Sequence, residues 1–452
     1  PYVLRFNCLI SFAFAGLLSA CGGSDSETET GTIGVEPVIP FITTWEAEDN
    51  EDYDDASKIK ISTSGSGYNY QVDWGDGTIN KNIKGNITHI YQSGGTKTVS
   101  ITGWFPRINF GDECGNGYPK LLTIEQWGDT NLQSLKKAFY GCKDFISNAS
   151  DSPDLSMVSS MESMFMLASN FDGDLSNWDV SSVENMEEMF RGASSFNGDI
   201  SSWDVSSVKD MDSMFRDAIS FNQSLNSWDV SSVKDMGGMF YSAKSFNGDL
   251  SNWDVSSVKD TEWMFSGASS FNQDLSNWDV SSVTNMSNMF NGASRFNQDL
   301  SSWNVSSVNT MSFMFSVASN FNQDLSIWDV SAVLDMQYMF YQASNFNSDL
   351  SGWDVRFVDN MSSMFNSASS FDQDLSSWDV ASVLMMNQMF NGIALSTLNY
   401  DALLLGWSVQ SLKTDVIFNG GNSHYSSVSQ SARDTLTNAF NWTLTDGGVE
   451  PL

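Results

Sequence analysis

A 25-residue unit that recurs nine times between Met161 and Met385 constrains the fold of this chain more than any other feature. The unit reads M-x-x-M-F-x-x-A-S-x-F-N-x-D-L-S-x-W-D-V-S-S-V-x-x. One position in it is always tryptophan: Trp178, Trp203, Trp228, Trp253, Trp278, Trp303, Trp328, Trp353 and Trp378. A fixed period of this length, with identical apolar positions, predicts a solenoid whose coils bury one another's faces.

Each coil is expected to contain two short elements. The apolar residues of one stretch follow the spacing of an amphipathic helix: Val183, Met186, Met189, Phe190 and Ala193. The segment 174–180 predicts a short strand, and stacked strands of this kind would form a long parallel sheet with the helices opposite. The predicted fold class is therefore an α/β repeat solenoid with one short parallel strand and one short helix per coil.

The motif of the unit has a known counterpart. Residues 271–283 read FNQDLSNWDVSSV and reproduce the repeat MFxGAxxFNQDLSxWDVSxVxxM. The chain therefore resembles the BspA-type leucine-rich repeat surface proteins of this 25-residue class. The resemblance implies a leucine-rich-repeat-like solenoid in a surface-anchored protein, and its better-known relatives adhere to host matrix proteins or to other cells.

The repeats are bounded by less regular segments. Degenerate units extend the array upstream over 111–160, regular units occupy 161–393, and residues 394–452 leave the period. The last segment reads as helix, strand, helix and strand, and a solenoid needs a terminal unit that covers its last apolar coil. We expect an N-terminal cap of degenerate repeats and a C-terminal cap without chemistry of its own.

Residues 41–110, which precede the repeats, alternate between apolar and polar in the manner of strands. The turn Trp74-Gly75-Asp76-Gly77 is followed by Thr88-His89-Ile90-Tyr91. This stretch resembles the PKD domain, an immunoglobulin-like sandwich of extracellular proteins, so a small all-β sandwich is expected. PKD domains act as spacers or binding modules, which favours a structural role for His89 over a catalytic one.

The N-terminus predicts export and anchoring. Residues 1–20 hold a single charge and a short apolar run typical of a signal peptide. The run ends in Leu18-Ser19-Ala20-Cys21, which is similar to the bacterial lipobox and implies a lipid on Cys21. Residues 21–40 are polar and acidic and predict a flexible tether. Cell-surface exposure on a bacterial outer membrane, through the lipid anchor alone, is the expected localisation.

Two cysteines remain after the signal peptide and Cys21 are set aside, Cys114 and Cys142. In an exported protein they could form one disulfide between the start of the array and the segment before it. Two buried thiols are the alternative, and the sequence leaves both open.

Charge and histidine content exclude several classes of function. The 21 Lys+Arg against 55 Asp+Glu give a formal net charge of −34, which argues against binding to nucleic acid. The two histidines, His89 and His424, lie far apart in sequence, so triads with histidine and multi-histidine metal sites are not expected. We expect a monomer that is not an enzyme and has no cofactor.

Two aspartate columns run along the repeats, and Asp274, Asp279 and Asp299 are typical members. Stacked carboxylates repel one another, so each needs a compensating partner. Turn and helix-start amides are one such partner and are favoured, since Ser224 and Asn304 interrupt the columns. A row of Ca²⁺ ions between coils is the alternative. The Asn column is expected to form a buried amide ladder, and the Met pairs and Trp column to fill the core.

The function favoured by these features is a non-catalytic adhesin or ligand-binding scaffold on the cell surface. Its partner would be a protein or glycan of a host or neighbouring cell, bound through many weak contacts. A structural, self-associating envelope protein and a secreted polysaccharide-active enzyme are the alternatives. An enzyme should break the repeat at one place with unique polar residues, whereas the deviations Trp263, Arg356, Lys244 and Phe357 are scattered.

Overall fold

The computed structural model describes residues 38–47, 57–111, 114 and 120–451. Residues Val38–Leu452 belong to one compact unit. The expected signal peptide, Cys21 and the tether up to residue 37 lie outside the described residues. Among the residues that are described, no helix has the length and apolar character needed to cross a membrane.

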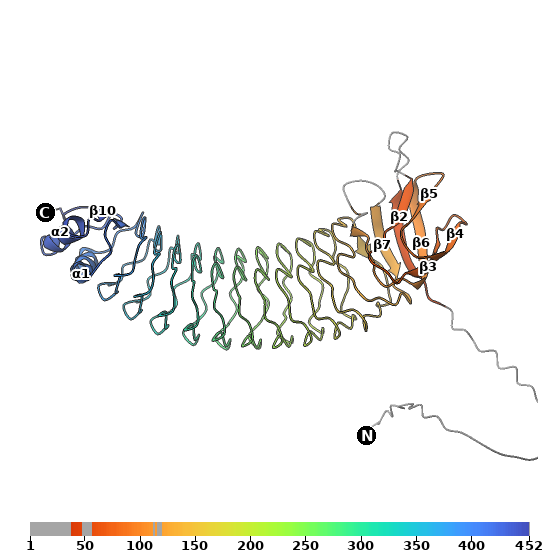
Figure 1. Cartoon of the computed structure of the whole chain (residues 1–452), viewed down its shortest axis with the longest axis horizontal. Coiled ribbons are helices and arrows are strands. Elements are labelled where there is room, and N and C mark those ends of the chain that lie inside the picture. Colours follow the sequence, from red (N-terminus) through yellow and green to blue (C-terminus); the bar gives the residue numbers. More distant parts are fainter. Residues whose placement is uncertain (1–37, 48–56, 112–113, 115–119, 452) are drawn as a thin grey trace, which may run out of the picture. The chain divides into compact units, whose positions relative to one another are not determined.

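The segment before the repeats is all-β. Its larger sheet has six strands in the order β4-β3-β6-β1-β7-β8, and β2 and β5 form a second, two-stranded sheet (Figure 1). The bounds are β1 Phe41–Ala47, β2 Lys58–Ile61, β3 Asn69–Asp73, β4 Ile79–Ile83, β5 Ile87–Ile90, β6 Gly95–Trp104, β7 Lys120–Gln126 and β8 Ile146–Ser147. The sheet extends beyond residue 110, because β7 pairs with β1 and then, in parallel, with β8.

The coils contain neither of the two elements expected in them. Between Ser147 and Thr397, a fully described stretch, the backbone forms turns joined by isolated parallel bridges, with no helix or strand. Each bridge links the residue before the first Met of one unit to its equivalent in the next, as Asn185 to Asp210. The expectation of one strand and one helix per coil is therefore wrong, although the repeat architecture itself is present.

Backbone conformation explains why no helix forms. Glu188 and Gly192 have φ of 54° and 70°, left-handed values that a right-handed helix cannot contain. Alternate N–H groups leave the coil: Met186 and Phe190 donate to Asp210 and Met214 of the next coil, at 3.0 and 2.9 Å. The N–H groups between them close tight turns instead. The spacing i, i+3, i+4, i+7 thus marks successive turns with one buried face.

Aromatic columns form the core of the array. Phe190 stacks on Phe215 of the next coil with 5.6 Å between ring centroids. The tryptophans of the repeat column are at most 6 % exposed, which confirms their core position. Each array tryptophan from Trp203 onward donates its Nε1–H to the leucine or isoleucine carbonyl of the previous coil, as Trp278 does to Leu250 at 3.1 Å. The buried indole is thereby satisfied and locks neighbouring coils in register.

The Asn column also links coils. Asn272 Oδ1 accepts the N–H of Asn297, and the same bond recurs at 2.8 to 2.9 Å from Asn197 to Asp372. These side chains are exposed or half-buried, so the expected amide ladder exists but lies at the surface.

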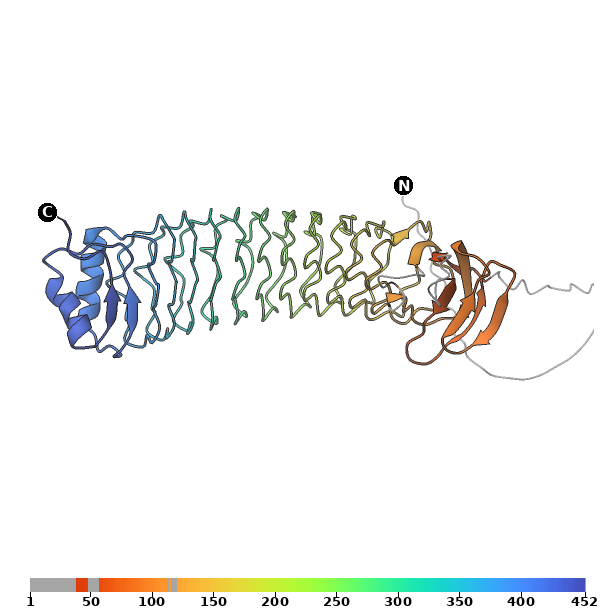
Figure 2. The ribbon, with the colours of Figure 1, turned by 90° about the horizontal axis from the view of Figure 1, so that it is seen from above.

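The C-terminal segment closes the array in the expected order of elements (Figure 2). These are α1 Thr397–Ser408, β9 Ile417–Asn419, α2 Gln430–Asn438 and β10 Thr443–Thr445. Trp407 of α1 donates to Leu375 O at 3.0 Å and continues the tryptophan column. Asp372 accepts the N–H of Ser396 at 2.8 Å and continues the Asn ladder. The cap therefore meets the last coil as another coil would.

Candidate ligand-binding face

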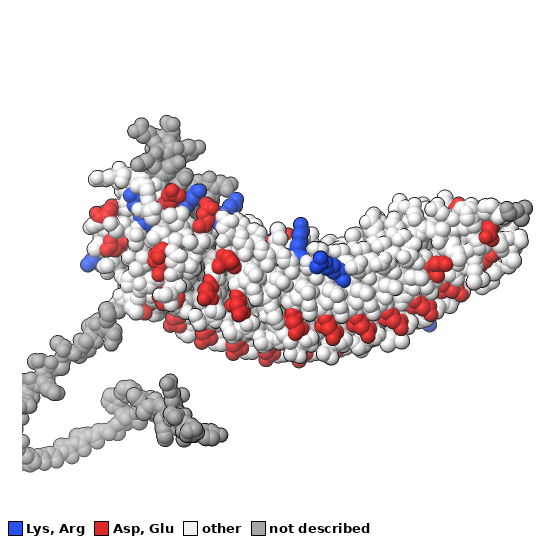
Figure 3. All heavy atoms as spheres, turned by 180° about the vertical axis from the view of Figure 1, so that it is seen from behind, with Lys and Arg blue, Asp and Glu red and all other residues white. Residues whose placement is uncertain are grey.

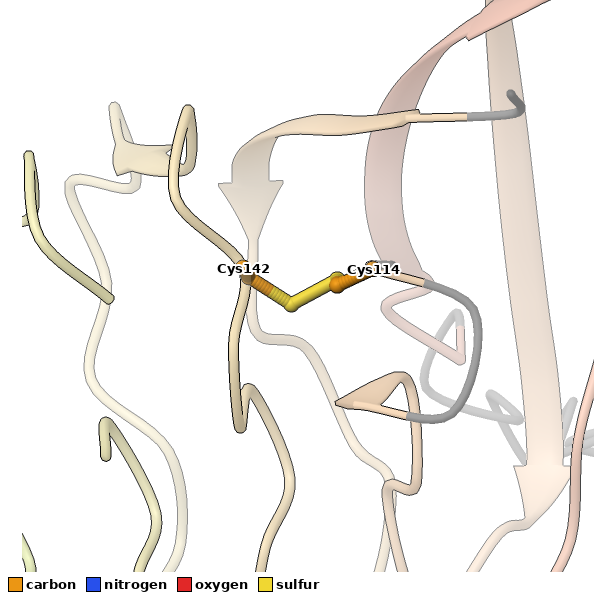
Figure 4. The surroundings of a disulfide bond; sticks show 2 residues. All are labelled: Cys114 and Cys142. Carbon is orange, nitrogen blue, oxygen red and sulfur yellow. A yellow bond between two sulfur atoms is a disulfide. The ribbon is translucent and has the colours of Figure 1, made fainter. Parts of the chain in front are cut away.

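Cys114 and Cys142 are joined by a disulfide, with 4.7 Å between their Cα atoms (Figure 4). The bond ties the segment that follows β6 to the first degenerate coil. Both residues therefore have a structural position, and neither thiol is available for chemistry.

The carboxylates of both aspartate columns are held by their own turns. Asp274 Oδ1 and Asp279 Oδ1 accept the N–H of Ser276 and Ser281 at 2.9 and 3.0 Å. Hydrogen bonds from these serines lower the pKa of both carboxyl groups. Asp299 Oδ1 accepts the N–H of Ser301 at 2.8 Å in the same way. Acidic side chains lie in rows along the array (Figure 3).

The interruptions of the columns keep this geometry. Asn304 Oδ1 accepts the N–H of Ser306 at 3.2 Å, which an amide oxygen can do as well as a carboxylate. Within the described residues, no group of three or more His, Cys, Asp or Glu is arranged to hold a metal ion. The hydrogen bonds of the aspartate columns are thus those expected of side chains that cap the backbone N–H groups of turns.

Sequence reasoning missed a third column of the same kind. Asp210, Asp235 and Asp260 each accept the N–H of the residue two positions later, at 2.7 to 3.0 Å. The position varies between Asp, Asn, Ser, Thr and Met along the array, so the repeat consensus hides it. This column borders two positions whose residues differ from unit to unit.

We call the two positions after the first Met of each unit the variable face. Its side chains change from coil to coil: Glu162–Ser163, Glu187–Glu188, Asp212–Ser213, Gly237–Gly238, Glu262–Trp263, Ser287–Asn288, Ser312–Phe313, Gln337–Tyr338, Ser362–Ser363 and Asn387–Gln388. Equivalent residues of adjacent coils touch: Ser312 Oγ donates to Ser287 Oγ at 3.1 Å, and Phe313 stacks on Tyr338 at 4.5 Å. The residues therefore form a continuous strip, acidic in its first half and polar with aromatic rings in its second. Several of its small side chains are buried, namely Ser163, Ser213, Ser287, Asn288, Ser312, Ser362 and Ser363.

A cavity of about 300 Å³ interrupts the variable face at the Gly237–Gly238 pair. It exists because two side chains are missing there. A Cβ atom at Gly237 would lie 3.1 Å from Asp212 Oδ1 and 3.2 Å from Asp235 Oδ1. The lining residues are Asp212, Ser213, Arg216, Asp235, Gly237, Gly238, Asp260, Glu262 and Trp263.

The walls of this Gly237 cavity are strongly polarised. Burial, together with repulsion by Asp235 and Asp210, raises the pKa of Asp212 to about 6. Arg216 lines the cavity, but its guanidinium stacks on Tyr241 at 4.4 Å and its Nε lies 3.8 Å from Asp217. Four carboxylates therefore line the cavity together with one guanidinium, and that guanidinium contacts Tyr241 and Asp217 instead of these four carboxylates. A positively charged group in the cavity would relieve their repulsion.

Trp263 forms the aromatic wall of the cavity. It is 37 % exposed, in contrast to the buried tryptophan column, and its Nε1–H donates to Glu262 Oε1 at 2.8 Å. An exposed indole beside carboxylates suits an ammonium group, through cation–π attraction, or the apolar face of a sugar ring.

Of the four deviating residues singled out in the sequence, Trp263 alone lines this cavity. Arg356 pairs with Asp354 at 2.8 Å in an aspartate turn, and Phe357 beside it is 58 % exposed. Asp212, Gly237 and Glu262 were missed. The available signal was a glycine pair where other units carry side chains, with acids one unit before and one unit after it.

The turn Trp74-to-Gly77 and the segment Thr88-to-Tyr91 contact one another through their side chains. His89 Nε2 lies 2.7 Å from Asp76 Oδ2, and the imidazole stacks on Trp74 at 4.9 Å. Tyr91 donates its hydroxyl hydrogen to Trp74 O at 2.9 Å. The hydrogen bond from His89 lowers the pKa of Asp76 to about 2. These contacts agree with a structural role for His89.

Comparison with known proteins places the repeats in a family. The model of the family described as "Mycoplasma protein of unknown function, DUF285" matches residues 133–252, 239–339 and 314–430, together about two thirds of the chain. No curated protein matches the chain.

Proposed function

Because the chain belongs to the DUF285 family of repeat proteins, we propose that it is a surface scaffold that binds a partner along its variable face. Other positions also differ between units, such as the pair after each Phe, so variation alone does not single out this strip. What distinguishes it is the Gly237 cavity, which is lined by four carboxylates and by Trp263, whose side chain is 37 % exposed. This cavity is the observation that supports the proposal.

The cavity specifies the kind of contact. Asp212, Asp235, Asp260 and Glu262 would receive a basic group of the partner, a lysine or arginine side chain or an amino sugar, with Trp263 packed against it. Neighbouring coils then add weaker contacts, and affinity grows with the number of coils engaged. The partner is a protein or glycan on a host or neighbouring cell, and the binding is adhesive.

A glycan and matrix-protein array with residues 31–452 tests the proposal. Gly237→Gln fills the cavity and Trp263→Ala removes its wall, so both should weaken binding of any partner found. Gly352→Gln is the matched control, because a Cβ there meets nothing closer than 3.4 Å and the residue lies off the variable face. Equal binding by all three variants would refute the assignment of the face.

Anchoring completes the proposal. Lipid on Cys21 would hold the protein at the outer membrane with the repeats exposed, as the lipobox-like sequence Leu18-Ser19-Ala20-Cys21 suggests. Cys21→Ala should release the protein from membranes and abolish labelling by acyl-chain analogues. Unchanged membrane retention of this variant would contradict the anchor.

One observation favours a second function, cleavage of a polysaccharide. Asp212, with a pKa near 6 beside further carboxylates, has the property of a general acid in glycoside hydrolysis. Incubation with a panel of bacterial and host polysaccharides should separate the two functions. Release of reducing ends by the wild type, lost in Asp212→Asn, would replace the scaffold proposal by a catalytic one.

A further inference from the structure

A cavity of about 470 Å³ lies between the all-β segment and the first degenerate coil. Its lining has a character opposite to that of the Gly237 cavity. The residues are Ser64, Arg107, Ile108, Asn109, Gln133, Ser134, Lys136, Lys137 and Ser159, with three basic side chains and no acidic one. We call it the basic pocket. In a chain of net charge −34, such a concentration of positive charge requires an explanation.

Arg107 is positioned by the backbone around it. Its Nη1 donates to Ser64 O at 3.1 Å, and a Cβ atom at Gly65 would overlap this nitrogen. Its carbonyl accepts the hydroxyl hydrogen of Tyr68 at 3.1 Å, and its backbone forms a parallel bridge with Ser134. No carboxylate within the described part of the chain pairs with this guanidinium. Its remaining N–H donors and its charge are therefore available to a ligand.

The two lysines come from the first coil. Lys137 has φ of 58°, and its N–H donates to Glu162 O at 2.9 Å, as the equivalent residues of later coils do. Its side chain is exposed, with no ion pair to a described carboxylate. Lys136 forms an ion pair with Glu162 at the edge of the pocket. Lys136 and Lys137 thus hold the two positions that are acidic or polar in the next coils. The variable face is therefore positively charged at its N-terminal end and negatively charged in the coils that follow.

We propose that the basic pocket binds an acidic sugar, through a carboxylate or sulfate group carried on the ring. A guanidinium recognises such an oxyanion with two parallel hydrogen bonds, and a lysine ammonium adds a point charge. The hydroxyl and amide groups of Ser134, Ser159 and Gln133 can serve the ring hydroxyls. The volume suits one or two sugar rings, at the lower end of the range for small-ligand sites. The pocket lies at the N-terminal end of the variable face, but it shares no lining residue with the Gly237 cavity.

Calorimetry with defined tetrasaccharides tests the proposal on the full chain in detergent. The probes are a uronic-acid tetrasaccharide, a sulfated one and a neutral one. We expect binding of at least one acidic probe and none of the neutral probe. The arm that binds identifies carboxylate or sulfate as the recognised group. No binding of either acidic probe at millimolar concentration would overturn the proposal, as would equal affinity for a glutamate-rich peptide.

Variants locate the site. Lys137→Gln and Arg107→Gln should each lower the affinity about tenfold or more, since each removes a charge-assisted contact. Gln is compatible with the backbone at residue 137, because Gln388 holds the equivalent position with φ of 59°. Lys234→Gln, an exposed lysine in the repeats, is the charge-matched control and should stay within twofold of wild type. An equal loss in this control would show diffuse attraction and refute the pocket. Lys137→Gln keeps the test valid if Arg107→Gln does not fold.

Discussion

Asp212→Asn should make the protein more stable at neutral pH, although it removes a charged group from a cavity lined by polar side chains. The pKa of Asp212 is raised from 3.8 to about 6, so the folded state holds this proton more tightly than the unfolded state. The stabilising contribution is fully present below the unfolded pKa and is lost as the pH rises through 6. Above pH 6 the ionised carboxylate destabilises the fold, and the asparagine variant lacks this penalty.

The size of the effect follows from the shift. A difference of roughly two pKa units corresponds to about 3 kcal/mol as an upper limit. Asp212 is half-buried, and solvent screening reduces this to about 1 kcal/mol. For a chain of this length, that is a rise in melting temperature of about 1 to 2 °C. The asparagine keeps an oxygen for Ser213 Oγ, which donates to Asp212 Oδ1 at 3.3 Å.

Differential scanning fluorimetry at pH 7.5 and pH 4 measures the prediction. The gain should be present at pH 7.5 and nearly absent at pH 4, where Asp212 is protonated in the folded protein. Asp274→Asn is the control: hydrogen bonds from Ser276 lower the pKa of Asp274, so its neutralisation should give no gain at either pH. A gain for Asp212→Asn that is the same at both pH values, or absent at pH 7.5, would refute the electrostatic reasoning.

Four further results are expected. Asn272→Ala should cost about 1 kcal/mol, measured by urea unfolding, because the N–H of Asn297 loses its acceptor; no loss would mean that water replaces the ladder. Trp407→Phe should cost about 1 to 3 kcal/mol by leaving Leu375 O unpaired, and unchanged protease resistance of the last coils would contradict this. Cys142→Ser should cost about 3 kcal/mol, since the disulfide closes a loop of sequence separation 28, and an unchanged urea midpoint would oppose it. EDTA should leave the melting temperature unchanged, whereas a drop of about ten degrees reversed by Ca²⁺ would favour the calcium row.

The burial pattern of the repeats could be predicted from sequence, but their backbone could not. Which residues face the core depends on apolar spacing, and Met186, Met189 and Phe190 are buried as expected. Whether that spacing belongs to a helix or to successive turns depends on residues in left-handed conformation. Gly192 carries a sequence signal for such a conformation, but Glu188 at φ of 54° carries none.

The candidate site could not be predicted from the sequence for a related reason. The Gly237 cavity is created by side chains that are missing in one coil and walled by acids one unit away on either side. A consensus describes only what the units share, so it does not show a cavity that depends on the residues of one coil. The basic pocket forms only where the segment between β2 and β3, the segment after β6 and the first coils meet, and the sequence separation of Ser64 and Ser159 gives no indication of this.

The Asn ladder has a consequence for how the length of this protein can change. Asp372 gives the cap the same hydrogen bond that each Asn gives the next coil, and Trp407 takes the place of a repeat tryptophan. Recombination between near-identical units would therefore add or delete whole coils and leave both ends intact. A single inserted residue would instead move one rung out of line and interrupt the ladder. The length of the array can be reset in steps of one coil, and each step alters how many coils separate the Gly237 cavity from the cap.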